Sequence, residues 1–247
     1  MRALLLAAGF GTRLRPVTDT VPKCLVPVHG KPLLGYWFDL LFPDHCDKVL
    51  VNTHYLPGMV NDFIATSPWR ERVALVHEAG ELLGTGGTVL ANRDFFEGRP
   101  FMLVHADNLT RFDVAAFFER HRTRPAGAEI TMMTFTSDQP CSCGIVEENA
   151  EGLVTAFHEK VANPPGNRAN AAVYILEPAV VNFIASLNKP VVDFSTEVIP
   201  HFLGRICTFH NSRYHRDIGT LESLAKAEAD FTQSSCWMAP AGALPRT

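Results

Sequence analysis

The sequence predicts an α/β fold, in the form of a Rossmann-like mixed, mainly parallel sheet with helices on both faces. Short apolar runs rich in β-branched residues alternate with segments whose apolar residues recur every three or four positions. The first pattern is typical of buried parallel strands and the second of amphipathic helices, so their alternation indicates a doubly wound sheet. A glycine-rich segment at residues 9–11 directly follows the first run, where open α/β sheets bind ligands.

The predicted elements follow one another without a linker or an internal repeat. Strands are expected at residues 3–6, 48–52, 73–77, 100–105, 129–134, 144–148, 153–159 and 171–176. Helices are expected at residues 33–42, 56–66, 86–92, 114–122, 178–186, 196–203 and 221–232. The Asn-Ala-Glu-Gly sequence at 149–152 is typical of a hairpin turn. We therefore predict one domain over residues 1–232 and a loose C-terminal tail at 233–247, where periodicity ends.

The overall composition excludes several classes of partner. The 247 residues include 22 basic and 26 acidic side chains, with a formal net charge of -4 and no basic stripe, so nucleic acid is not an expected partner. No apolar stretch reaches the roughly 18 residues that a membrane helix needs. The six cysteines form no CxxC pair and are expected to be reduced thiols. These features predict a cytoplasmic protein without a membrane partner.

The segment after the first predicted strand has the residues of a phosphate-binding loop. Gly9 and Gly11 allow the backbone to approach a polyphosphate and to turn its N–H groups toward the oxygens. Arg13 can place a forked guanidinium on the charge that develops during transfer, and Lys23 can add a second cation. A dinucleotide-binding fingerprint would have a third glycine where this chain has Leu14. The pattern therefore favours phosphate chemistry over a nicotinamide-dependent oxidoreductase.

Two acidic residues are candidates for a metal site. Asp107 follows the apolar run at residues 101–104, and Asp217 precedes the last predicted helix. Phosphoryl-type transfer requires charge neutralisation, which Mg²⁺ commonly supplies when held by one or two carboxylates and by substrate phosphates. The alternative is that each aspartate caps a helix. Together with the phosphate loop, the metal role is the favoured interpretation.

Several motifs together resemble those of one enzyme family. Gly9-x-Gly11-Thr12-Arg13-Leu14-x-Pro16, followed by Pro22-Lys23, is similar to the signature of the sugar-1-phosphate nucleotidyltransferases, also called NDP-sugar pyrophosphorylases. The resemblance continues, in the family's order, through the motifs at residues 83–87, 105–108, 159–160, 170 and 217–220. It covers about residues 1 to 230 and is highly specific in its first motif.

The resemblance implies a single α/β domain without a C-terminal β-helix, whose N-terminal half binds the NTP and whose C-terminal half binds the sugar 1-phosphate. It implies Mg²⁺ as the cofactor, with Asp107 and Asp217 as its ligands. The implied catalytic residues are Arg13, Lys23, Asp107 and Asp217. The implied nucleotide-binding residues are Leu6, Ala8, Gly9, Gly11, Thr12, Arg13, Glu78, Gly84 and Thr85, although Thr85 is also a candidate helix cap. The implied sugar-phosphate-binding residues are Gly144, Glu159, Lys160 and Asn170.

The activity implied by the resemblance is transfer of a nucleoside monophosphate from an NTP to a sugar 1-phosphate, with release of pyrophosphate. The run at residues 157–160 favours GTP with mannose- or heptose-1-phosphate. UTP- or TTP-dependent transferases, including one for N-acetylmuramic acid 1-phosphate, remain alternatives, as do a phosphocholine transferase and a non-catalytic regulatory paralogue. Products of the family feed surface glycans, and a homo-oligomer is left open. Two departures are Cys24, where many relatives have Pro, and Ala172, where they have Gly.

Overall fold

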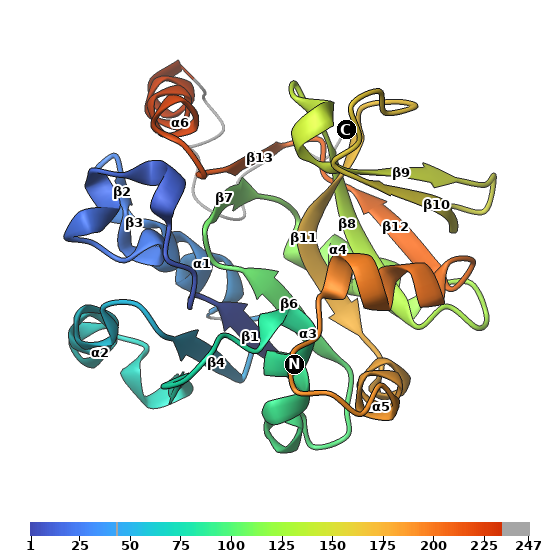
Figure 1. Cartoon of the computed structure of the whole chain (residues 1–247), viewed down its shortest axis with the longest axis horizontal. Coiled ribbons are helices and arrows are strands. Elements are labelled where there is room, and N and C mark those ends of the chain that lie inside the picture. The colour runs from blue at the N-terminus through green and yellow to red at the C-terminus, as the bar shows by residue number, and fades with distance from the viewer. Residues whose placement is uncertain (43, 234–247) are drawn as a thin grey trace.

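The computed structural model describes residues 1–42 and 44–233, and a nine-stranded sheet runs through them (Figure 1). Its N-terminal half is parallel, because β1 pairs with β4 and β6, and β4 pairs with β5. These strands have the bounds β1 Arg2–Leu6, β4 Lys48–Thr53, β5 Val73–His77 and β6 Phe101–His105. All four therefore end at the same edge, where the phosphate loop begins.

The C-terminal half adds antiparallel pairs. Strand β11 lies antiparallel to β6 and to β8, β12 extends this part parallel to β8, and β9 and β10 form the predicted hairpin. Their bounds are β8 Ile130–Thr136, β9 Gly144–Glu148, β10 Val154–Glu159, β11 Arg168–Leu176 and β12 Ile206–His210. Two small sheets pair β2 Pro27–Val28 with β3 Lys31–Pro32, and β7 Asn108–Arg111 with β13 Tyr214–Asp217. The predicted mixed, Rossmann-like sheet is confirmed.

Helices cover both faces of the sheet, as predicted (Figure 1). One face carries α1 Leu33–Leu41, α2 Pro57–Thr66 and α4 Val114–Arg122, and the other carries α3 Gly84–Ala91 and α5 Pro178–Ser186. Helix α6, Leu221–Gln233, packs beside β2 over a smaller apolar cluster. Short 3-10 turns lie at Thr12–Leu14, Val17–Asp19, Lys23–Leu25, Arg70–Arg72, Arg93–Phe96 and Pro140–Ser142.

The alternation of side chains along the parallel strands fills two cores at once. Leu5 and Val51 belong to the cluster beneath α1 and α2, while their neighbours Leu4 and Leu50 belong to the cluster beneath α3 and α5. Because successive strand residues point to opposite faces, a continuous apolar run is what a sheet covered on both sides requires. Burial of each leucine side chain contributes roughly 1.5–3 kcal/mol to the stability of the strands that carry the site.

One predicted helix is wrong. Residues 196–203 do not form a regular helix but a π-helical turn at Phe194–Val198 followed by a 3-10 turn at Ile199–Phe202. Pro200 has no N–H to donate and its ring clashes with a continuing α-helix, which explains the irregular backbone. Strands β2, β3, β7, β12 and β13 were not among the predicted elements.

The last helix ends one residue later than predicted. Helix α6 extends to Gln233, one residue into the predicted tail, and residues 234–247 lie outside the described residues. No helix formed by residues 1–42 and 44–233 combines the length and the apolar character that crossing a membrane requires.

Strand β11 contains a bulge at Ala172, the position at which many relatives have Gly. Its pairing with β8 shifts register between Asn170 and Tyr174, and Ala172 has a φ of 53°. The Asn170 Oδ1 accepts a hydrogen bond from the Ala172 N–H at 3.0 Å, which stabilises this local turn. The chain therefore keeps at Ala172 a left-handed conformation that favours glycine.

We expect Ala172→Gly to raise the free energy of unfolding by up to about 1 kcal/mol. The left-handed conformation costs a residue with a Cβ roughly 1–2 kcal/mol, of which the greater freedom of unfolded glycine cancels a part. Urea unfolding measures the change. The matched control is Ala171→Gly, one residue earlier in buried strand without positive φ, which should lower stability. Equal losses in both variants would contradict the prediction.

Candidate active site

The phosphate loop uses its two glycines in different ways. Gly11 has a φ of 65°, and a Cβ placed there would lie 2.9 Å from Cγ2 of Thr18, so only glycine fits this turn. The Gly11 carbonyl accepts hydrogen bonds from the Leu14 N–H and the Thr18 hydroxyl, which fixes the 3-10 turn at Thr12–Leu14. A Cβ at Gly9 would meet nothing within 4 Å. The backbone at Gly9 is therefore open to a ligand.

A cavity of about 200 Å³ lies at the carboxyl ends of the parallel strands. From the predicted nucleotide-binding set it is lined by Leu6, Ala8, Gly9, Glu78, Gly84 and Thr85. Asp107 also lines it, together with four residues that were not in that set, Asn52, Leu82, Thr88 and His105. Gly11 and Thr12 are not among its lining residues, and Arg13 lines a second cavity instead. The loop thus separates two cavities.

A buried hydrogen-bond network holds Glu78 in the first cavity. The Asn52 side chain accepts from the Ala7 N–H at 2.7 Å and donates to Oε1 of Glu78 at 2.8 Å. The Thr88 hydroxyl donates to the same oxygen at 2.6 Å, and the Leu83 N–H donates to Oε2 at 3.3 Å. Asn52 is the penultimate residue of β4, the strand next to β1, and a polar residue near the end of a buried strand could have been recognised from the sequence.

The glycines of α3 allow a close approach by a segment of the C-terminal half. A Cβ at Gly84 would lie 2.7 Å from the Val192 carbonyl oxygen, and one at Gly87 would lie 2.2 Å from that of Pro190. The Gly86 N–H donates to the Val192 oxygen at 2.9 Å. The cap interpretation of Thr85 is wrong, because α3 begins at Gly84 and has Leu83 at its N-cap position, without a side-chain cap.

The two aspartates and Lys23 meet in one cluster. Asp107 follows β6, and Asp217 ends β13, which pairs with β7 so that Asp217 lies opposite Asn108. The Lys23 ammonium donates to Oδ2 of Asp107 at 2.5 Å and to Oδ1 of Asp217 at 3.2 Å. The cap interpretation of Asp217 is also wrong, since the hydroxyl of Thr220 accepts from the backbone of the first turn of α6.

The charges of this cluster stabilise one another. Burial alone would lower the pKa of Lys23, but the negative charges of Asp107 and Asp217 outweigh it and raise that pKa above its ordinary value. Burial alone would raise the pKa of Asp107, but the positive charge of Lys23 outweighs it and lowers that pKa. Lys23 and Asp107 are therefore both charged at neutral pH.

Two histidines beside the cluster are neutral. Burial lowers the pKa of His105, and it lowers the pKa of His215 to about 3. The ring centroids of His215 and Phe135 are 4.3 Å apart. Nδ1 of His215 has no hydrogen-bond partner among the described residues. These rings add polar atoms to the cavities without adding positive charge.

A second cavity, of about 340 Å³, lies beside Asp217. Arg13, Lys160 and Asp217 line it, together with the β8–β9 connection and the first turns of α6. Arg216 also lines it and is held by Asp230 at 3.0 Å. The lining of this cavity was not predicted, because it combines segments that lie far apart in the sequence.

The predicted sugar-phosphate residues lie on neighbouring strands. Gly144 and Glu159 are cross-strand partners in β9 and β10, and a Cβ at Gly144 would lie 2.4 Å from Cζ of Phe157. Lys160 pairs with Glu159 at 3.1 Å, while the Asn170 amide donates to the hydroxyl of Tyr174 at 2.6 Å. Of this set, Lys160 lines the second cavity, and the other three residues line neither of the two cavities.

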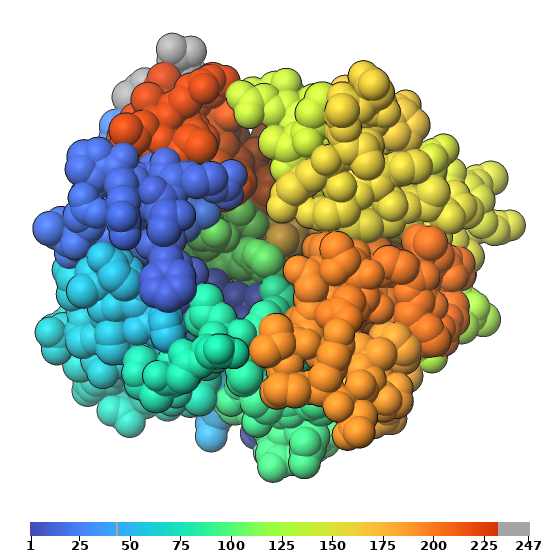
Figure 2. All heavy atoms as spheres, in the orientation of Figure 1, coloured from blue at the N-terminus to red at the C-terminus, as the bar shows by residue number. Residues whose placement is uncertain are grey.

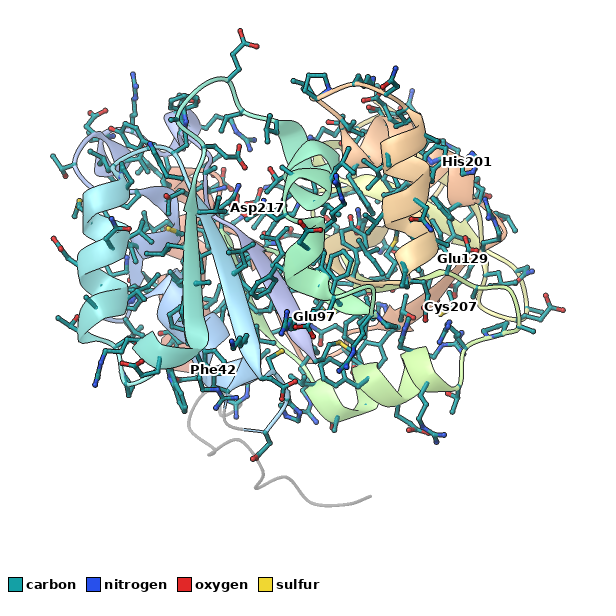
Figure 3. The ribbon with its side chains drawn as sticks, turned by 90° about the horizontal axis from the view of Figure 1, so that it is seen from below. Phe42, Glu97, Glu129, His201, Cys207 and Asp217 are labelled. Atoms are coloured by element: carbon teal, nitrogen blue, oxygen red, sulfur yellow. The ribbon has the colours of Figure 1, made fainter. Side chains whose placement is uncertain are left out.

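The site lies in a hollow between the two halves of the chain. Figure 2 shows this hollow between N-terminal segments in blue to green and C-terminal segments in yellow to orange. Figure 3 shows Asp217 toward the opposite end of the parallel strands from Phe42 and Glu97. Among residues 1–42 and 44–233, no group of three or more His, Cys, Asp and Glu side chains could hold a metal. A metal ion at this site would therefore also need oxygen atoms from a bound substrate or from water.

The fold and the site together define an α/β protein with a phosphate loop and a carboxylate pair at the ends of its parallel strands. Residues 2–234 match the model of the nucleotidyl transferase family, and the chain belongs to this family. The predicted membership is thereby confirmed.

Three curated relatives have names that state two different pairs of nucleotide and sugar. Mannose-1-phosphate guanylyltransferase 1 of Arabidopsis thaliana is 32% identical over 189 residues, which cover 74% of this chain and 52% of that protein. Mannose-1-phosphate guanylyltransferase of Mycobacterium tuberculosis is 30% identical over 247 residues, covering 98% of this chain and 67% of that protein. A UTP–glucose-1-phosphate uridylyltransferase of Synechocystis is 29% identical over 199 residues, covering 75% and 51%. The chain thus spans about half the length of the first of these relatives.

Two solved structures share the fold. A structure from Bacillus anthracis, assigned as a glucose-1-phosphate thymidylyltransferase, superposes with a TM-score of 0.82 at 22% identity, covering 93% of this chain and 94% of that one. HddC from Yersinia pseudotuberculosis, complexed with GMP-PN, superposes with a TM-score of 0.75 at 25% identity, covering 93% and 99%. The first likeness concerns the fold alone.

Proposed function

We propose that this chain is a nucleotidyltransferase that joins a nucleoside monophosphate from an NTP to a sugar 1-phosphate and releases pyrophosphate. The observation that carries the proposal is the cluster of Lys23, Asp107 and Asp217 between two cavities, with the open backbone of Gly9 beside it. One cavity has room for part of a nucleotide and the other is lined by Arg13 and Lys160. The transfer reaction would then occur at the cluster, where the two cavities meet.

The proposed reaction needs positioning and charge rather than a side-chain nucleophile. An oxygen of the sugar 1-phosphate attacks the α-phosphorus of the NTP, the bond between that phosphorus and the bridging oxygen breaks, and pyrophosphate leaves with the electron pair. Arg13 and Lys23 stabilise the charge on the leaving group, and Lys160 orients the sugar phosphate. A base is unnecessary because the attacking phosphate is already ionised at neutral pH.

Asp107 and Asp217 fit a Mg²⁺ ion, which we propose as the cofactor. Carboxylate oxygens are the ligands that Mg²⁺ prefers, and it commonly takes one or two of them with substrate phosphates and water. A single cation, the Lys23 ammonium, already contacts both carboxylates, so their oxygens converge on one point. When bound, the ion would neutralise the charge of the phosphates.

GTP with mannose- or heptose-1-phosphate is the favoured substrate pair. The support comes from the two guanylyltransferase relatives and from Glu78. Oε2 of Glu78 accepts one hydrogen bond among the described residues, so it retains capacity for a base that presents N–H donors, and guanine presents two adjacent ones. The uridylyltransferase relative keeps UTP as the alternative.

The decisive experiment is pyrophosphate release with Mg²⁺, measured for GTP, UTP, TTP and ATP against mannose-, glucose-, heptose- and N-acetylmuramic acid 1-phosphates. We expect release with GTP and mannose- or heptose-1-phosphate. Turnover only with UTP or TTP would keep the reaction and reject the guanylyl preference. Silence in every combination, with nucleotide binding intact, would reject catalysis and favour a regulatory paralogue.

A further inference from the structure

Lys23 is bonded to the two carboxylates rather than left free in the cavity. Its ammonium donates to Asp107 at 2.5 Å and to Asp217 at 3.2 Å, and only 10% of its side chain is exposed. The 3-10 turn at Lys23–Leu25 is itself buried. Its Cβ lies 3.2 Å from the position that a Cβ on Gly11 would occupy, so the stem passes directly behind the phosphate loop.

This placement has a consequence for any metal at the same carboxylates. The point that contacts one oxygen of each aspartate is the point at which a divalent cation would bind, and an ammonium and a metal ion cannot share it. The two cations would also repel each other in a half-buried setting, where charges interact more strongly than in water. Lys23 must therefore leave this point when the metal binds.

We propose that Lys23 alternates between two positions: it binds the carboxylate pair until a metal displaces it, and it then donates to the leaving pyrophosphate. This inference rests on the proposed function and deepens it. Because the Cβ of Lys23 lies beside Gly11, we infer that a change of side-chain rotamer carries the ammonium from the carboxylates toward the loop. Lys23 thus lowers the affinity for metal alone, and phosphates that attract its ammonium raise that affinity.

The first test measures the binding of Mn²⁺ in the absence of nucleotide. Electron paramagnetic resonance detects the bound ion. We expect Lys23→Met to bind Mn²⁺ at least about tenfold more tightly than the wild type, since charge-assisted hydrogen bonds to Lys23 no longer compete. The matched control is Arg13→Met, which removes the same charge from a residue that lines the cavity beside Asp217. It should change Mn²⁺ affinity much less. If both variants bound Mn²⁺ more tightly by the same factor, the loss of one positive charge would explain the result. That outcome would overturn the proposed movement of Lys23.

Two further measurements guard against a variant that does not fold. Lys23→Gln keeps a hydrogen-bond donor without the charge and should show the same tighter binding. In the wild type, reductive methylation of Lys23, followed by mass spectrometry, should rise several-fold when Mg²⁺ is added, while that of the exposed Lys48 stays constant. Methylation of Lys23 that does not respond to Mg²⁺ would overturn the proposal.

The same data separate this inference from the proposed function. If Asp107→Asn does not weaken Mn²⁺ binding, the metal site itself is wrong. If Mn²⁺ binds through Asp107 but with equal affinity in the wild type and Lys23→Met, only the exchange of Lys23 is wrong.

Discussion

Asp107→Asn should lower kcat by at least about 10²–10³-fold while the protein remains folded. Asparagine has nearly the same shape, but it carries no charge and is a poor ligand for a hard cation. Loss of one group that stabilises charge in the transition state commonly costs this much. The substitution also removes the closer of the two carboxylates that hold Lys23, at 2.5 Å. Steady-state release of pyrophosphate measures the loss.

The matched control is Asp113→Asn, which changes the charge by the same amount away from the site. Asp113 is the N-cap of α4 and accepts from the Ala116 N–H at 2.9 Å, a role that Asn fills equally well. Its ion pair with Arg213 is partly exposed and contributes at most about 1 kcal/mol. We expect wild-type turnover. Residual activity of Asp107→Asn near that of the control would remove Asp107 from the catalytic residues.

The elements that depend on local pattern were predictable from the sequence. The continuous apolar runs at residues 3–6 and 100–105 predict two buried strands, and Gly9, Gly11 and Asp107 follow these runs closely, so the neighbouring sequence alone places them near strand ends. The hairpin of β9 and β10 is equally local, because the side chain of Asn149 accepts from two N–H groups of its own turn.

The arrangement of the site could not be derived from local pattern. Lys23 and Asp217 are 194 positions apart, and their contact depends on β13 pairing with β7, two strands too short to be recognised. The second cavity likewise needs Arg13 to face α6. Residues 196–203 were instead predicted to form a helix that the structure does not contain. Their apolar residues follow a helical pattern, but Pro200 lacks the N–H donor that a regular helix requires.

Gly87→Ala should lower the free energy of unfolding by at least about 3 kcal/mol. The new methyl group would lie 2.2 Å from the carbonyl oxygen of Pro190, which is backbone and cannot rotate away. Overpacking of this kind costs typically 1–3 kcal/mol. Separating α3 from the 190–192 segment would also break the hydrogen bonds Gly86 N–H to Val192 and Val192 N–H to Leu83, each worth about 1 kcal/mol.

The control for Gly87→Ala is Gly58→Ala, in helix α2. A Cβ at Gly58 would meet nothing within 4 Å, so this change should stabilise the protein by about 0.4–1 kcal/mol through the unfolded state. Urea unfolding of both variants separates steric contact from helix propensity. Because Gly84 and Thr85 line the first cavity, the displacement of α3 should also weaken nucleotide binding in Gly87→Ala alone. Wild-type stability of Gly87→Ala would show that the contact between α3 and the C-terminal half is not close-packed.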